Sequence, residues 1–133
     1  MVGRGSARPL ENASSMCQIF INADPDLYTT RSRSLRLHGV ATSLRLENLF
    51  WQVLEEIGAR DGLTVPQLAS RLYDELLQSG RLDDTTNFAS FLRVCCLRYL
   101  RLQLAGRIPA DSAVPIRELD PAWVLSAERH PCA

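Results

Sequence analysis

The residues of this chain that could do chemistry are mainly arginines, and they are gathered in two stretches. Residues 31–46 contain four Arg and no acid, and residues 85–110 again contain four Arg and no acid. Residues 47–84, between them, carry eight acids and three Arg. The planar guanidinium of Arg suits phosphates and guanine edges, and binding needs a local basic patch rather than a positive total. The zero net charge therefore leaves nucleic acid open as a ligand, although it argues against strong non-specific binding.

Residues for other chemistries are few. The four Cys form no CxxC pattern, and the two His, His38 and His130, fit no metal-ligand spacing. Cys95 and Cys96 lie together in an apolar stretch, which favours core packing. Because no nucleophile–base motif is found either, we expect no catalytic residue, no metal and no cofactor. The N-terminus has no apolar signal segment and no stretch approaches ~20 apolar residues, so we expect a soluble, cytoplasmic protein.

The tetrapeptide SLRL occurs twice, at 34–37 and at 43–46. Around the second copy the side chains alternate, as they do in a strand. This pattern predicts that Thr42, Leu44 and Leu46 lie on one face. The opposite face would carry Ala41, Ser43 and Arg45.

After Leu46 the spacing becomes helical. Apolar residues then recur at three- and four-residue intervals as far as Ile57, which predicts an amphipathic helix ended by Gly62. Thr64 followed by Gln67 forms a capping box that opens a second helix, which ends at Gly80. A third helix is expected over about 87–104. It is apolar nearly all round, which predicts that it packs on the core or at the interface with a partner chain.

The rest of the chain divides into shorter segments. We expect a disordered arm over residues 1–15 and an extension with short strands over 16–39, which includes CQIFI at 17–21. A core over 40–80 and the third helix over 81–105 follow. Residues 106–133 contain four Pro and predict an irregular tail, in which PAWVL at 121–125 is a candidate docking segment.

A single strand of about five residues is not stable alone, and no partner strand is evident downstream. We therefore expect two chains to pair this strand antiparallel and to pack their helices together as a homodimer. A two-stranded ribbon of this kind fits the major groove of B-DNA. The core of that dimer would be formed by the apolar faces of the strand and of the first helix, at Thr42, Leu44, Leu46, Phe50 and Leu54.

The segment ATSLRLENLFWQVLEEIGARDGLTVPQLASRLYDEL resembles a ribbon-helix-helix domain. Over roughly residues 17–104 the chain is similar to small bacterial proteins predicted to carry that domain. The resemblance implies a mainly α fold with a short β-ribbon, an obligate homodimer and double-stranded DNA as the partner. It implies base reading by Ala41, Ser43 and Arg45, and phosphate contacts by Thr64 and Val65 at the start of the second helix. Ala41 departs from the pattern, since the family's readers are usually three polar residues.

Two questions stay open at this point. The first SLRL could pair with the second through a turn at His38-Gly39, or it could belong to an arm whose Arg31, Arg33 and Arg36 reach phosphates. The protein could be a transcriptional regulator, or the same dimer could be an antitoxin-like or adaptor module that binds a protein through residues 86–133. An apolar face of the third helix that is buried in the dimer would favour DNA as the ligand, and an exposed one would favour a protein partner.

Overall fold

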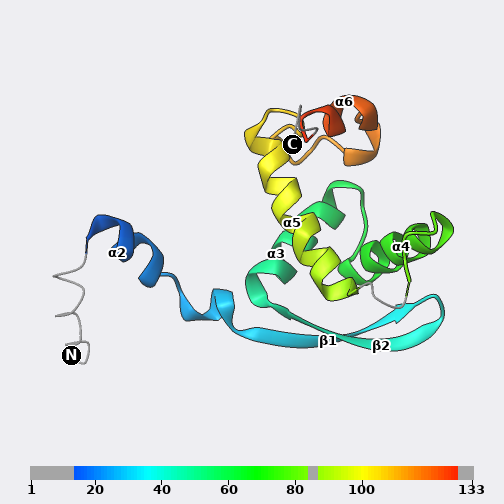
Figure 1. The fold of residues 1–133 in the computed structure, drawn as a ribbon, viewed down its shortest axis with the longest axis horizontal. Helices are drawn as coiled ribbons and strands as arrows, with labels where there is room; N and C mark the ends of the chain where they lie inside the picture. The colour runs from blue at the N-terminus through cyan, green and yellow to red at the C-terminus, as the bar shows by residue number, and fades with distance from the viewer. Residues whose placement is uncertain (1–13, 84–86, 129–133) are drawn as a thin grey trace.

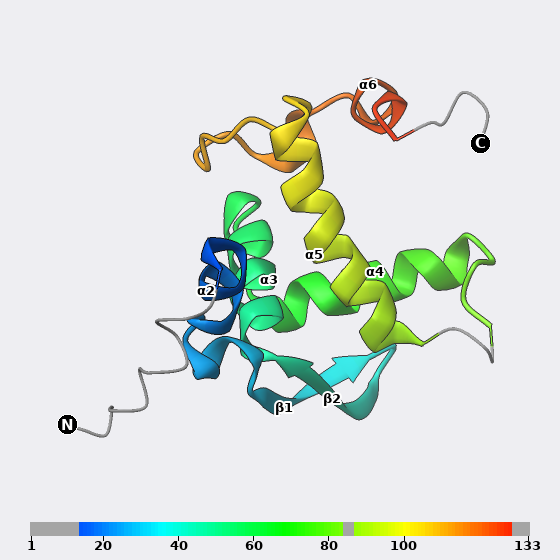
Figure 2. The same cartoon turned by 60° about the vertical axis from the view of Figure 1, so that its left-hand side comes forward.

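A computed structural model describes residues 14–83 and 87–128 of the chain. A β-hairpin forms the base of the molecule, and three longer helices cover one face of it (Figures 1 and 2). The expected mainly α fold with a short β-ribbon and an additional helix is confirmed. The elements, in order, are α2 (Ser15–Ile21), η1 (Pro25–Tyr28), β1 (Thr30–Leu37), β2 (Val40–Glu47), α3 (Asn48–Arg60), α4 (Val65–Gln78), α5 (Phe88–Leu104), η2 (Ile116–Glu118) and α6 (Pro121–Ser126).

The hairpin joins the two SLRL copies within one chain. β1 and β2 pair antiparallel, with Ser34 opposite Ser43 and Leu37 opposite Val40. The two residues between the strands have positive φ angles, 51° at His38 and 81° at Gly39. Positive φ at both positions defines a type I′ turn, whose twist matches that of the flanking strands. The hairpin alternative for the first SLRL is therefore correct, and β2 has a partner strand upstream in its own chain.

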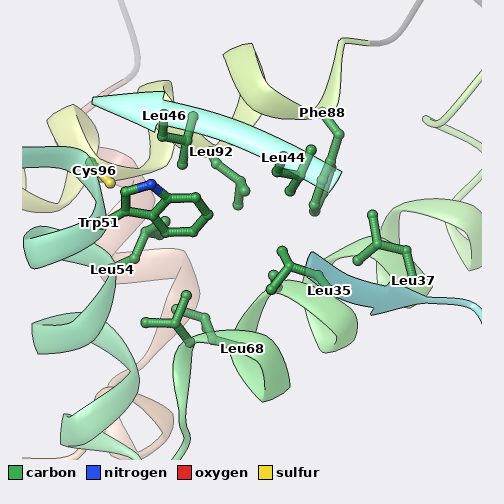
Figure 3. Packing of buried hydrophobic residues seen from close by; sticks show 12 residues of the cluster. Leu35, Leu37, Leu44, Leu46, Trp51, Leu54, Leu68, Phe88, Leu92 and Cys96 are labelled. Carbon is green, nitrogen blue, oxygen red and sulfur yellow. The ribbon is translucent and has the colours of Figure 1, made fainter. Parts of the chain in front are cut away.

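The core lies between the hairpin and the helices. One face of the hairpin contributes four leucines, and α3, α4 and α5 contribute the residues that pack on them (Figure 3). Trp51 and Leu54 on α3 and Leu92 on α5 are at most 1% exposed. The cluster comprises Leu35, Leu37, Leu44, Leu46, Trp51, Leu54, Val65, Leu68, Ala69, Phe88, Leu92 and Cys96.

The turn between α3 and α4 depends on two glycines. Gly62 has a φ of +73°, and the Leu63 N–H donates to the Gly58 carbonyl at 2.8 Å, which is the bond of a Schellman motif. The loop passes so close to α3 that a Cβ on Gly58 would lie 2.7 Å from the Leu63 carbonyl oxygen. The expected capping box follows at once, because the side chains and amides of Thr64 and Gln67 bond reciprocally at 3.2 and 2.9 Å.

Two segments differ from their expected conformation. CQIFI, expected as a strand, lies in helix α2, whose first turn is capped by Ser14 Oγ accepting from the Cys17 amide at 3.2 Å. The expected irregular tail contains η2 and α6, and Val124 packs with Ile108 against Tyr99 and Leu102 of α5. The expected disordered arm lies almost wholly outside the described residues.

A buried arginine holds this tail to the body. Arg60, at the end of α3, is 5% exposed. Its guanidinium donates to the carbonyls of Pro109, Asp111 and Val114 at 2.8–3.0 Å and to the Tyr99 hydroxyl at 3.2 Å. Buried charges are tolerated only when they are fully hydrogen-bonded, so these carbonyls fix the loop after α5 over the end of α3.

Gly58→Ala tests the close approach in the α3–α4 turn. The added methyl group requires the backbone at Leu63 to shift, so we expect the free energy of unfolding to fall by about 1–3 kcal/mol, as for other overpacked sites. Urea denaturation followed by circular dichroism measures this free energy of unfolding. The control is Glu55→Ala, an exposed change one turn earlier that should alter stability by less than ~0.5 kcal/mol. Equal stability of the two variants would contradict the geometry of this turn.

Candidate nucleic-acid interface

The hairpin presents a polar face on the side away from the helices. The side chains of that face alternate with the buried leucines, and all six of its central residues are exposed. The register places them in three cross-strand pairs. The pairs are Ser32 with Arg45, Ser34 with Ser43 and Arg36 with Ala41. No acid is among them, so the face offers hydroxyl and guanidinium donors to a ligand rich in acceptors.

All three expected base-reading residues lie on this face. The structure also brings Arg36 directly opposite Ala41, the reader that lacks a hydrogen-bonding side chain. Arg36 Nη1 donates to the Gly39 carbonyl at 3.1 Å, which uses one of the five N–H groups of the guanidinium. Side chains alternate between the two faces of β1, and this alternation could have predicted that Arg36 lies on the other face from Arg31 and Arg33.

Arg31 and Arg33 lie on the opposite face of β1. The Arg33 guanidinium stacks over the buried Trp51 ring at 5.1 Å, and Trp51 Nε1 donates to the Arg31 carbonyl at 2.9 Å. Cation–π contacts of this kind contribute roughly 0.5–2 kcal/mol. The structure therefore does not group the three arginines of β1 together, and it gives Arg33 a packing contact.

A further arginine, on α5, lies at the edge of β2. Arg93 Nε donates to Glu47 Oε1 at 2.9 Å, and Arg93 Nη2 donates to the Arg45 carbonyl at 3.4 Å. The bond from Arg93 holds the pKa of the Glu47 carboxyl below its ordinary value. The register pairs Glu47 with Thr30 at the end of the polar face, so Arg93 offsets a charge there that would oppose a nucleic acid. Nothing in the local sequence links residues 47 and 93, which is why the pair was not expected.

The start of α4 keeps two donors. The capping box uses the Thr64 and Gln67 amides, while Pro66 has none. The Thr64 hydroxyl proton and the Val65 amide remain, and no acceptor for either is found in the described part of the chain. Thr64 is exposed, and the Val65 side chain is buried at 4%. Only the backbone of Val65 can therefore contact an anion.

The residues expected in a dimer core are packed within the single chain. Leu44, Leu46 and Leu54 are buried against the chain's own helices. Thr42 is half-buried opposite Leu35 on β1, and Phe50 is half-buried with Arg93 6.0 Å from its ring. The strand pairing that was expected between two chains is thus provided, on one edge of β2, by β1.

The cysteines of α5 fit their expected packing role. Burial raises the pKa of the Cys96 thiol to about 12 and also raises the pKa of Cys95. A thiol that stays protonated at neutral pH is a poor nucleophile and metal ligand. Within residues 14–83 and 87–128 no three His, Cys, Asp or Glu side chains gather as a metal site. No helix in those residues is long and apolar enough to cross a membrane.

Comparisons with known proteins agree with this geometry. No curated protein matches the chain. A solved structure, that of an uncharacterized protein from Bordetella pertussis Tohama I, is similar, with 63% sequence identity and a TM-score of 0.80. The match covers 85% of this chain and 89% of that one. Residues 30–100, which hold the hairpin, α3, α4 and most of α5, match a family model described as a ribbon-helix-helix domain. This protein belongs to the ribbon-helix-helix domain family.

Proposed function

We propose that this protein is a sequence-reading transcriptional regulator that binds double-stranded DNA as a homodimer through the polar face of its hairpin. One observation carries the proposal: the six central residues of the exposed strand face are two arginines, three serines and an alanine, with no acid among them, in a chain of zero net charge. Ala41, Ser43 and Arg45 on β2 would read base edges in the major groove. Arg45 is suited to guanine, which accepts two hydrogen bonds from a guanidinium. No catalytic step is part of this proposal.

The edge of β2 that faces away from β1 supports pairing with a second copy. The two-residue turn makes Leu37–Val40 a hydrogen-bonded pair, and such pairs alternate along an antiparallel ladder. The N–H and C=O groups of Ala41, Ser43 and Arg45 therefore point away from β1, and the Arg45 carbonyl, which accepts from Arg93 Nη2 at 3.4 Å, would exchange that bond for one to the second strand. An exposed edge of this kind is a template for another strand. In the proposed dimer β2 pairs antiparallel with β2 of the second copy, and each β1 becomes an outer strand.

An apolar stripe on α5 lies on the same side. Arg93 reaches the Arg45 carbonyl, and Leu97, Leu100 and Leu104 follow it at four-, seven- and eleven-residue steps on one helix face. With Val94, these side chains are between 41% and 88% exposed. A row of exposed apolar side chains is typical of an interaction site. A second copy paired through β2 would bring the two stripes together, and it would bury them.

The start of α4 is proposed as a phosphate contact. A helix N-terminus attracts anions because its first amides are unpaired and the helix dipole is positive there. The Thr64 hydroxyl and the Val65 amide are the donors that the capping box leaves over. This contact carries no sequence information, so its part is to hold the dimer in register on the duplex.

Arg45→Ala tests the reading face. Fluorescence anisotropy with a random-sequence duplex pool at two salt concentrations should show salt-sensitive binding of the wild type, and sequencing the duplexes that stay bound gives the enriched sequence. The variant should bind the enriched sequence more weakly by about 1–3 kcal/mol per lost guanine contact. Arg71→Ala, which removes an exposed arginine from α4, is the matched control and should bind almost normally. A folded dimer that binds no duplex at low salt would overturn the proposal.

Leu97→Asp tests the stripe. Placing a carboxylate in an apolar interface is costly, so we expect the variant to sediment as a monomer at concentrations where the wild type is a dimer. Leu77→Asp, at an exposed leucine on α4, should leave the dimer intact. Circular dichroism confirms that both variants are folded. A wild type that is monomeric both free and on DNA would contradict the homodimer.

A second candidate function has its own observation. Apolar side chains are also exposed on α6, where Trp123 is 52% and Leu125 is 44% exposed. The chain could therefore be an antitoxin-like or adaptor module that binds a protein through α5 and α6. The Leu97→Asp experiment distinguishes the two candidates. If the variant is still a dimer, the α5 stripe is not the dimer interface and is available to a different protein.

A further inference from the structure

We infer that β1 is a phosphate-contacting strand, and that Ser32, Ser34 and Arg36 of both copies lie against the two sugar-phosphate backbones that border the major groove. The inference rests on the proposed DNA-binding dimer and adds to it. It assigns a role to a strand outside the two-stranded reading ribbon. It also accounts for the first SLRL copy, whose outward residues repeat the Ser and Arg of the second.

The width of the sheet in the proposed dimer determines which strands can enter the major groove. The proposed dimer has the strand order β1, β2, β2 and β1, with the two β2 strands from different copies in the middle. Neighbouring strands are about 4.8 Å apart, so the two outer strands are about 14 Å apart. The major groove is about 12 Å wide. The two β2 strands fit between its walls, but the two β1 strands do not, and so they lie above the walls.

The chemistry of the outward side chains of β1 fits that position. The face carries two serine hydroxyls and one guanidinium, and all three residues are exposed. Hydroxyl and guanidinium donors are the usual partners of phosphate oxygens in DNA complexes. Glu47, which the register places at the end of the polar face opposite Thr30, is paired with Arg93 and so repels a phosphate less. Arg36 also lies opposite Ala41, so each copy places a guanidinium beside the one reader whose side chain has no hydrogen-bonding group.

The chain supplies a matched control on the same strand. Arg31 is exposed like Arg36, but its position in the alternation puts it on the face that carries the buried leucines. Removing either arginine takes the same charge from β1. Only Arg36 should contact the duplex, so the difference between the two variants reports which face of the strand meets DNA.

The experiment measures binding of wild type, Arg36→Ala and Arg31→Ala to the enriched duplex, to singly mismatched duplexes and to a scrambled duplex, over a series of salt concentrations. For Arg36→Ala we expect an equal loss of affinity on every duplex. The logarithm of the binding constant falls with the logarithm of the salt concentration, and each lost phosphate contact makes this slope less steep by about 0.9. Loss of the two Arg36 side chains of the dimer should therefore make it less steep by about 2. Arg31→Ala should keep the wild-type slope. Ser32→Ala/Ser34→Ala provides a second variant that should weaken all duplexes alike.

The other outcomes separate this inference from the proposed function. If Arg36→Ala relaxes the sequence preference at particular base pairs, β1 reads bases and the inference is wrong. That result would mean that β1 enters the major groove together with β2 of the same chain. If Arg36→Ala and Ser32→Ala/Ser34→Ala bind like the wild type while Arg45→Ala binds weakly, β1 does not meet DNA and only this inference fails. If the wild type binds no duplex, the inference fails together with the proposed function.

Discussion

The register of the β1–β2 hairpin is the constraint on which the rest of this molecule depends. Because strand side chains alternate, a slip of one residue would turn the leucines of a strand outward and the residues of its polar face inward. The type I′ turn at His38-Gly39 fixes the register from one end. At the other end the Asn48 amide donates to the Thr29 carbonyl at 2.9 Å, just beyond the strands. The same pairing therefore creates the core and the polar face together.

The helices stabilise that arrangement from one side only. α4 contacts β1, α5 contacts β2, and Trp51 at the start of α3 is buried where the strands end. The described residues leave the outer face exposed, and at the edge of β2 away from β1 the Arg45 carbonyl accepts a hydrogen bond from Arg93 of α5. This asymmetry is what a sheet that binds through one face requires, because its inner face provides stability while its outer face keeps exposed polar groups. The tail adds a second small core at the far end of α5, held by the hydrogen bonds of Arg60.

The sequence predicted most of the local structure, because local signals are strong here. The change from period two to helical spacing after Leu46, the capping box at Thr64 and the bounds of α5 are all confirmed. The faces of β2 follow from alternation alone, as Leu44 and Leu46 are buried and Ser43 and Arg45 exposed. Alternation applied to β1 from Leu35 and Leu37 would also have put Arg33 and Arg36 on different faces.

The remaining features depend on contacts between distant segments, which no local pattern encodes. Burial of Arg60 requires carbonyls about fifty residues later, and the pairing of Glu47 with Arg93 requires α5 to cross β2. The apolar stretch at 17–21 is short enough to be either helix or strand. Among the described residues no strand pairs with it, and the Ser14 cap stabilises the helix. The dimer was first inferred from an unpaired strand. Since β1 pairs with β2, that inference now rests on the other edge of β2 and on the apolar stripe of α5.

The most direct test of the central claim, that the outer face of the hairpin is the DNA interface, is to map amide chemical shifts while the enriched duplex is titrated into ¹⁵N-labelled protein. We predict that the largest chemical-shift changes fall on β1 and β2, at Ser32, Ser34, Arg36, Ala41, Ser43 and Arg45, and that smaller changes occur at Thr64 and Val65. Changes concentrated on α5 and α6, with the hairpin amides unmoved, would contradict this claim.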